Sequence, residues 1–235
     1  MNRDPGVAAR LGQVRERIEQ AARGAGRDPA EVTLIGVSKT QPAEEVAAAF
    51  AAGLKVFGEN RVQEAQAKAQ LLPPAVEWHL IGPLQSNKAR VAAELFSVVH
   101  SVDRLKIAQA LDQEATRLAR RLPCFLEINL GGEESKHGFI VEELPAALEP
   151  LAALPQLDIV GLMAIPPFED DPEASRPWFR RLAELRDQME ARAVLPAFRG
   201  FLSMGMSNDF EVAIAEGATH VRVGTAIFGE RRARA

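Results

Sequence analysis

The alternation of apolar and polar residues along the chain predicts short strands separated by helices. Between the apolar runs lie alanine- and charge-rich segments with helical spacing, such as "PAEEVAAAFAAG" and "DRLKIAQALDQEATRLARR". Strands that alternate with helices are typical of parallel βαβ units. Eight runs rich in β-branched and aromatic residues are expected to be the strands, and they begin at Val32, Leu54, Glu77, Leu95, Cys124, Leu157, Phe198 and Thr219.

Eight strands in a chain of 235 residues favour a single (β/α)8 TIM-type barrel, preceded by an extra helix at about residues 5 to 23. One domain is expected to span residues 1–235, because no repeat, low-complexity segment or long linker divides the chain. A doubly wound open sheet is the alternative. The Pro- and acid-rich segment "IPPFEDDPEASRP" is expected to be a surface loop between the sixth strand and its helix.

Composition and charge narrow the class of partner. Lys plus Arg number 28 against 32 for Asp plus Glu, a net charge of −4, so no overall basic field would attract nucleic acid or an anionic membrane. No segment approaches the roughly 20 apolar residues of a membrane span, and the N-terminus has no signal-peptide core. Cys124 is the single cysteine, which indicates a reducing compartment. We therefore expect a cytoplasmic protein.

The candidate chemistry lies where the predicted strands end, because the reacting groups of such barrels come from the C-terminal ends of the strands. Lys39 follows the first strand in "IGVSKTQP". A lysine amine held against apolar walls has a lowered pKa and can add to an aldehyde. An ordinary solvated lysine after a strand would look the same in sequence.

The loop after the seventh strand, "SMGMSND", is rich in small and hydroxyl residues. The backbone N–H groups of Gly205, Met206 and Ser207 are candidates to bind an anion at the start of a helix capped by Ser207 or Asn208. In the alternative, Ser207 and Asn208 serve only as caps, and Glu211 completes a capping box.

The loop after the eighth strand, "GTAIFG", offers a second anion candidate at Gly224 and Thr225, unless Gly224 only forms a turn. Phosphate groups commonly bind to the loops after strands seven and eight of such barrels. An amine that faces a phosphate cradle across the barrel predicts pyridoxal 5′-phosphate (PLP), which carries both an aldehyde and a phosphate.

Several motifs, in order from about Val32 to Glu230, resemble those of the pyridoxal phosphate homeostasis protein family. They are "GVSKTQP", "FGENRVQE", "WHLIGPLQSNK", "SVD", "INLGGEESKHGF", "GLMAIPP", "LSMGMSNDFEVAI" and "GATHVRVGTAIFG". The resemblance implies a stand-alone barrel like that of alanine racemase, with the cofactor in a Schiff base on the lysine that matches Lys39. It also implies a role in binding and supplying PLP, with effects on amino-acid and keto-acid balance. Apo PLP-dependent enzymes are the expected acceptors, and the chain is expected to be a monomer.

The same resemblance gives roles to other residues. It places Asn60 near the ring oxygen of the cofactor, although Asn60 equally fits the N-cap of "RVQEAQAKAQ", with Gln63 at the capping-box position. Arg222 is expected to point inward and reach the phosphate or the pyridine nitrogen, where a cation would weaken the ring as an electron sink. The alternative is an outward Arg222 paired with a helix acid. The phosphate contacts implied are Ser207, Gly224 and Thr225, in a loop shaped by Ser203, Gly205 and Met206.

Two further residue types complete the prediction. Lys136 in "ESKHG" is a second amine that is able to accept the aldehyde during handover, or else a solvated side chain. His79 lies inside an apolar strand and is expected to be a bonded core or rim histidine rather than a catalyst. The histidines show no metal-ligand spacing, so we expect no metal site.

Catalytic functions could use the same lysine and the same barrel. A PLP-dependent racemase needs an acid or base on each face of the substrate carbon, and the barrel racemases that this chain resembles use a tyrosine from a separate β domain. This chain has no tyrosine and no such domain. A lyase-like PLP enzyme, or a Schiff-base aldolase without the cofactor, would also place a reactive lysine at the barrel rim. The sequence favours a cofactor-binding protein with no catalytic residue.

Overall fold

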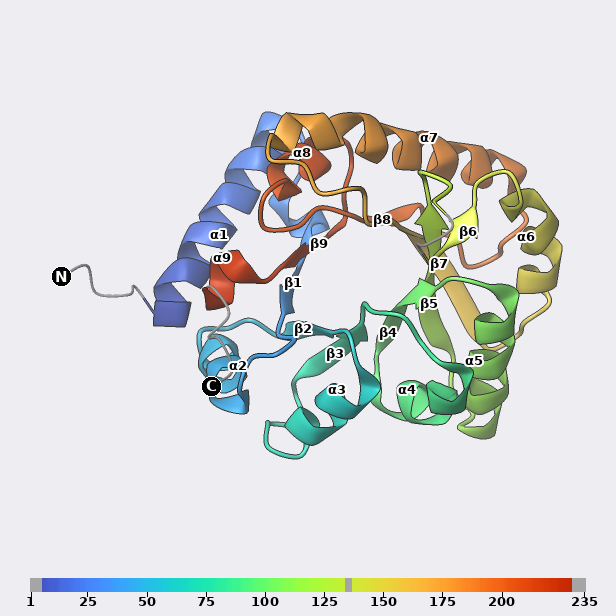
Figure 1. Ribbon diagram of the computed structural model, residues 1–235, viewed down its shortest axis with the longest axis horizontal. Coiled ribbons are helices and arrows are strands. Elements are labelled where there is room, and N and C mark those ends of the chain that lie inside the picture. Colours follow the sequence, from blue (N-terminus) through green and yellow to red (C-terminus); the bar gives the residue numbers. More distant parts are fainter. Residues whose placement is uncertain (1–5, 134–136, 230–235) are drawn as a thin grey trace.

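Eight parallel strands close into a barrel surrounded by helices (Figure 1). The computed structural model describes residues 6–133 and 137–229. The strand order is β4-β3-β2-β1-β9-β8-β7-β5, and the pairing of β4 with β5 closes the barrel. The barrel strands are β1 (Thr33–Val37), β2 (Val56–Glu59), β3 (Glu77–Leu80), β4 (Val98–Val102), β5 (Leu122–Asn129), β7 (Leu157–Met163), β8 (Phe201–Ser203) and β9 (His220–Val223).

Helices follow the strands and form the outer ring (Figure 1). Three short 3₁₀ helices also occur, at Pro29–Glu31, Ser86–Lys88 and Pro172–Ser175. The α-helices are α1 (Gly6–Gly24), α2 (Ala43–Ala51), α3 (Val62–Ala69), α4 (Ala89–Leu95), α5 (Leu105–Arg117), α6 (Leu144–Ala152), α7 (Arg176–Arg192), α8 (Phe210–Ala215) and α9 (Thr225–Phe228).

The predicted barrel, its eight strands and its extra N-terminal helix are confirmed. The open-sheet alternative is wrong, because β1 pairs with β9 and β4 with β5, which leaves the barrel without an edge. One short strand was not expected: β6 (Phe139–Ile140) pairs with the end of β5. The segment expected to be a loop before α7 contains the 3₁₀ helix Pro172–Ser175.

Helix α1 lies on the outer ring beside α8, α9 and α2 (Figure 1). Polar contacts tie α1 and the turn that follows it to α8: Arg17 pairs with Glu211 of α8, and Arg27 donates to the carbonyl oxygens of Ile214 and Ala218 at 2.9 and 2.8 Å. Glu211 therefore pairs with α1 instead of completing a capping box. The helix buries an apolar stripe of helical spacing, formed by Val7, Leu11, Val14, Ile18 and Ala22.

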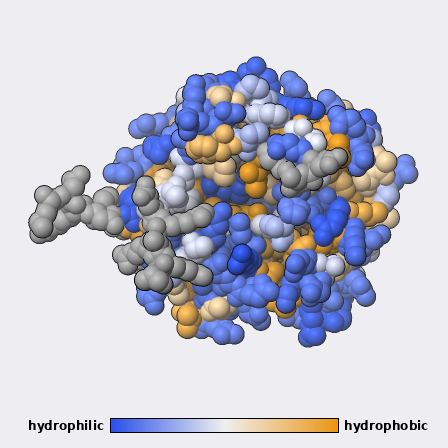
Figure 2. Space-filling model, viewed as in Figure 1, coloured by the Kyte–Doolittle hydropathy of each residue, from blue (hydrophilic) through white to orange (hydrophobic). Residues whose placement is uncertain are grey.

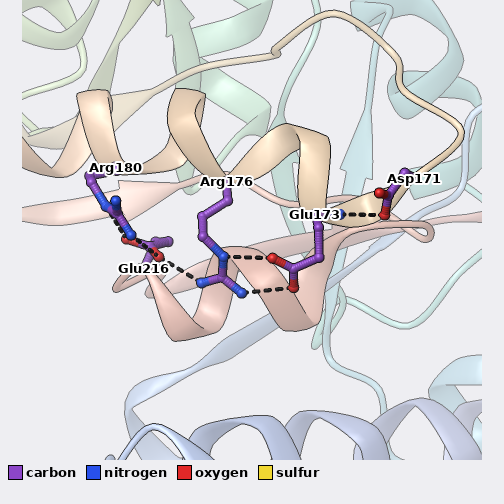
Figure 3. Close-up of polar contacts among 5 residues, drawn as sticks. All are labelled: Asp171, Glu173, Arg176, Arg180 and Glu216. Carbon is purple, nitrogen blue, oxygen red and sulfur yellow. Dashed lines mark hydrogen bonds and ion pairs between the residues drawn. The ribbon is translucent and has the colours of Figure 1, made fainter.

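An ion-pair cluster joins α7 to the C-terminal end of α8 (Figure 3). Arg176 donates to Glu173 at 2.7 and 2.8 Å and to Glu216 at 2.6 Å, and Arg180 reaches Glu216 as well. Asp171 caps the 3₁₀ helix by accepting the N–H of Glu173. Although exposed ion pairs contribute only about 0–1 kcal/mol each, this cluster restrains the helix that follows β8.

The surface and the barrel interior are more polar than the layer between the strands and the helices, which holds the main apolar core. Figure 2 shows this face of the molecule as mostly hydrophilic, with apolar residues toward its centre. Within residues 6–133 and 137–229, no helix has the length and apolar composition needed to span a bilayer. Inside the barrel, a small apolar cluster of Phe125, Val160 and Met163 packs against Val98 and Phe201.

Gly161 permits a close approach of β7 to β8. It pairs with Phe201, and a Cβ added at Gly161 would lie 2.0 Å from the Phe201 carbonyl oxygen. We predict that Gly161→Ala lowers the free energy of unfolding by about 2–3 kcal/mol, because backbone must move to admit the methyl group. Urea unfolding measures this change. Gly12→Ala is the matched control: nothing lies within 4 Å of the added Cβ in α1, so this substitution should raise stability by about 0.5–1 kcal/mol. Equal effects of the two substitutions would contradict the close approach.

Candidate functional site

The loop after β1 carries Lys39, whose side chain is half-buried at the C-terminal end of the strand. Ser38 before it is fully buried. Thr40 after it has a φ of 65°, an uncommon conformation for a β-branched residue, and its N–H donates to Glu64 of α3 at 2.5 Å. The backbone on both sides of Lys39 is thus held by specific contacts.

A second lysine, Lys68 of α3, fixes the backbone of this loop at Ser38. Its Nζ donates to the Ser38 carbonyl oxygen and to Glu59 Oε1, both at 2.6 Å, and to Glu64 Oε1 at 2.8 Å. The Ser38 hydroxyl donates to the same Glu59 oxygen at 2.6 Å. The Lys68 side chain is 8% exposed and that of Glu59 is 0% exposed. Sequence reasoning missed this pair, although a lysine on the buried stripe of α3 was a usable signal.

Asn60 follows β2 and is half-buried. Helix α3 begins at Val62, with Arg61 in the N-cap position, so the alternative in which Asn60 caps this helix is wrong. Asn60 lines a rim cavity of about 740 Å³ together with residues after β3, β4 and β5, including Pro83, Gln85, Lys88, Arg104 and His137. The cavity has the size of a small-molecule site.

The two predicted anion loops meet in space. The Ser207 hydroxyl oxygen accepts the N–H groups of Gly224 at 3.2 Å and Ala226 at 3.4 Å. Thr225 is the first residue of α9. Gly205 has a φ of +89°, and an added Cβ would lie 2.6 Å from the Cβ of Ala213, so only glycine fits there without strain.

The start of α8 differs from the prediction. The helix begins at Phe210 with Asp209 in the N-cap position, so the expected caps at Ser207 and Asn208 are wrong. The Asp209 carboxylate accepts the N–H of Met206 at 2.7 Å. Because a carboxylate is a strong acceptor, it binds the Met206 N–H group, which was expected to face an anion. The Met206 N–H group is therefore engaged within the protein.

The relation between the lysine and these loops also differs from the prediction. The sequence suggested that Lys39 faces a phosphate cradle across the barrel. In the structure, β1 and β9 are neighbours, with Gly36 paired to Val223, and a Cβ added at Gly224 would lie 3.4 Å from that of Val37. Lys39 and the loop after β9 therefore belong to adjacent strands. This places the two groups on the same side of the barrel mouth.

Arg222 points into the barrel, as expected, and is 3% exposed. Its Nη1 donates to Ser203 Oγ at 2.8 Å and its Nη2 to the carbonyl oxygen of Ala164 at 3.0 Å. The alternative of an outward residue paired with a helix acid is wrong. Burial lowers the pKa of Arg222 to about 10, while Glu127 and Asp209 act in the opposite direction. The guanidinium is therefore a cation at neutral pH.

Histidines fill much of the barrel interior beneath Arg222. His79 is buried and bonded to His100 and Glu77, which confirms its predicted role as a bonded core residue. Burial lowers the pKa of His100 well below its usual range and that of His220 to about 3. In the part of the chain that the structure describes, no three His, Cys, Asp or Glu side chains form a group able to hold a metal ion.

Glu127 on β5 is a buried acid that sequence reasoning missed. It lies on the inner side of the strand with Phe125 and Asn129, two residues away on either side, and it is 8% exposed. Within the described residues, no donor contacts its Oε2 atom. It lines a second cavity, of about 320 Å³, with Ile165 and Trp178 among the other walls. The signal was a single carboxylate in the apolar run "CFLEINL". Lys136, the predicted second amine, lies outside the described residues.

Comparison with known proteins first defines the class. Residues 10–232 match the family described as "Alanine racemase, N-terminal domain". Alanine racemase from Bartonella henselae, solved with covalently bound pyridoxal phosphate, superposes with a TM-score of 0.71 at 14% identity, covering 97% of this chain and 60% of that one. That likeness concerns the fold. The chain is thus a barrel of the alanine racemase N-terminal-domain class.

Closer relatives define the family. The chain is 50% identical over 226 residues to the pyridoxal phosphate homeostasis protein of Pseudomonas aeruginosa, covering 96% of each. PipY of Synechococcus elongatus PCC7942, solved with PLP bound, superposes with a TM-score of 0.84 at 40% identity, covering 95% of this chain and all of that one. The chain belongs to the pyridoxal phosphate homeostasis protein family.

The buried Glu127 generates a prediction about stability and pH. Burial, followed by the charge of Asp103, raises the pKa of Glu127 to about 7 against the effect of Arg222. The folded protein therefore holds this proton more tightly than the unfolded chain, where a glutamate titrates near ~4.3. The resulting stabilisation is complete below about pH 4 and is lost as pH rises through 7.

We predict that Glu127→Gln matches the wild-type stability near pH 4 and exceeds it by on the order of 3 kcal/mol at pH 8, because the amide never ionises. Urea unfolding at a series of pH values measures the difference. Glu16→Gln, a change at an exposed glutamate of α1, is the control and should leave the pH profile of the wild type in place. A constant difference between Glu127→Gln and the wild type at all pH values would contradict the raised pKa.

Proposed function

We propose that this protein binds PLP at the C-terminal rim of its barrel and supplies the cofactor to other proteins inside the cell. The observation that carries the proposal is the adjacency of the half-buried Lys39 after β1 and the Ser207-bridged loops after β8 and β9. An amine and an anion cradle at neighbouring strand ends suit a ligand with an aldehyde and a phosphate. The membership of the family, and the PLP bound to PipY, support the same ligand.

The residues present fit the cofactor. The Ser207 hydroxyl oxygen accepts two backbone N–H groups at the site proposed for a phosphate oxygen, so these donors already converge on an acceptor. The Arg222 guanidinium has five N–H groups, of which two bond to Ser203 and Ala164, so it has donors left for a ligand. When bound, the cofactor supplies an aldehyde that forms a reversible covalent bond with an amine.

In this proposal each site residue has a distinct task. Lys39 provides the amine, held in place by the contacts of Ser38 and Thr40. Asn60 lies near the ring oxygen, and Arg222 presents a cation to the pyridine nitrogen or the phosphate. The phosphate contacts are Ser207, Gly224 and Thr225, and the loop shape depends on Ser203, Gly205 and Met206, with Lys136 as a second amine at the rim.

A carrier role accounts for the site better than catalysis does. Racemisation needs an acid or base on each face of the substrate carbon, and the chain contains no tyrosine for the second face. A cation beside the pyridine nitrogen would also weaken the ring as an electron sink. We therefore propose a cytoplasmic monomer without catalytic residues, which passes PLP to apo PLP-dependent enzymes and thereby affects amino-acid and keto-acid balance.

Lys39→Ala should abolish the covalent chromophore that PLP forms on the wild-type protein, while the fold remains intact, because the side chain contributes an amine and little core packing. The measurement is a visible spectrum before and after borohydride treatment, followed by mass mapping of the modified lysine. Lys88→Ala, at another lysine of the rim, is the matched control and should keep the chromophore. An undiminished chromophore mapped to a lysine other than Lys39 would refute the assignment. If borohydride traps no PLP on the wild-type protein but does trap a keto or aldehyde sugar, the result would support an aldolase instead.

The loaded protein should not racemise free amino acids appreciably faster than PLP alone, because Lys39 can act on only one face of the substrate carbon. The assay follows loss of the α-deuterium from labelled alanine and other amino acids. In parallel, apo acceptor enzymes mixed with the loaded protein should gain activity as its chromophore declines. Exchange with inversion at about 1 per second or faster would establish a racemase.

A further inference from the structure

A chain of hydrogen bonds runs through the barrel interior from the N-terminal end of β3 to Arg222. His79 Nε2 lies 3.3 Å from Glu77 Oε1, and His79 Nδ1 lies 3.0 Å from His100 Nε2. His100 Nδ1 lies 2.9 Å from Ser203 Oγ, which accepts from Arg222 Nη1 at 2.8 Å. The chain therefore crosses from β3 through β4 and β8 to β9, and it runs from the first residue of β3 to the second-to-last residue of β9.

With both imidazoles neutral, the two end groups of this chain favour one direction for its protons. A guanidinium only donates and a carboxylate only accepts. Ser203 Oγ accepts from Arg222, so its own hydrogen goes to His100 Nδ1. His100 then carries its proton on Nε2 and donates to His79 Nδ1, and His79 carries its proton on Nε2 and donates to Glu77.

The reverse direction is unfavourable at both ends. It would place the His79 Nε2 lone pair against the carboxylate of Glu77. It would also leave the Ser203 hydroxyl hydrogen without an acceptor in a buried place, which costs about 1–3 kcal/mol. Burial, followed by the neighbouring His79, His220 and Arg222, lowers the pKa of His100 and keeps it neutral. Its ring is held in place by stacking on Phe125, with centroids 4.3 Å apart.

We propose that Glu77, at the end of the barrel opposite the cofactor site, is a positioning residue for Arg222. By accepting the His79 proton, it fixes the tautomers of both histidines and leaves the Ser203 oxygen free to accept from Arg222. The guanidinium is thereby held in one orientation, which leaves the N–H groups not bonded to Ser203 and Ala164 to meet a ligand. The last step, in which those donors meet PLP, rests on the proposed function.

The first test examines the protein without PLP. Nitrogen-15 NMR of the histidine side chains should show the proton on Nε2, and not on Nδ1, of both His79 and His100. Glu77→Ala should increase the share of His79 protonated on Nδ1, whereas Glu77→Gln, which keeps an acceptor oxygen, should retain the wild-type pattern. Asp158→Ala is the matched control, because that carboxylate lies at the same end of the barrel but pairs with Arg121. A proton on Nδ1 of His100 in the wild type, or no change in Glu77→Ala, would overturn the proposal.

The second test measures PLP binding by titration of the visible band. Glu77→Ala should weaken binding between roughly 2-fold and 30-fold and move the band, while Glu77→Gln and Asp158→Ala should bind like the wild type. An equal loss in Asp158→Ala would show a general loss of stability and overturn the proposal. Expected tautomers with unchanged PLP binding in Glu77→Ala would overturn the link to the cofactor and leave the proposed function standing. Failure of the wild-type protein to bind PLP would refute the proposed function itself.

Discussion

The geometry of the site depends on one buried cation. Lys68 is removed from water on the inner stripe of α3, and this is stable only because three oxygen atoms, from Ser38, Glu59 and Glu64, accept its hydrogen bonds. These contacts tie the end of β1 to β2 and α3 at the residue before Lys39. The two lysines thus have different roles: the Lys68 amine bonds to other residues of the protein and fixes the backbone, and Lys39 projects from that backbone at the rim.

Polar side chains buried in the barrel interior carry a similar desolvation cost. Barrels of this class usually fill their interior with branched apolar side chains. Here three histidines, Arg222, Ser203 and Glu127 lie within it, and packing against Phe125 supplies much of the apolar contact. Burial lowers the pKa of both His100 and His220, so neither adds a positive charge to the interior at neutral pH. The remaining cation, Arg222, is bonded to Ser203 and Ala164, which makes a buried charge tolerable.

Much of the fold could be predicted from the sequence, because the eight apolar runs and the intervening helical segments each follow a period set by local geometry. Lys39 and the glycine-rich loops follow β1, β8 and β9, as the sequence predicted. The start of α8 could not be predicted as well, since Ser207, Asn208 and Asp209 are all good caps and the choice depends on where the Asp209 carboxylate finds the Met206 N–H. Lys68 and Glu127 were missed for a related reason: each had a local signal, an apolar stripe or an apolar run around it, but only the assembled barrel shows that the charged side chain itself is buried.

The pairing of the first strand with the last has a consequence for synthesis of the chain. Thr33 of β1 pairs with His220 of β9, and the apolar stripe of α1 packs beside α8 and α9. During translation, the edge of β1 that faces β9 and the apolar face of α1 therefore stay uncovered until α8, β9 and α9 have left the ribosome. An unpaired edge and an uncovered stripe promote aggregation, so the nascent chain is vulnerable until β9 has been synthesised and has paired with β1.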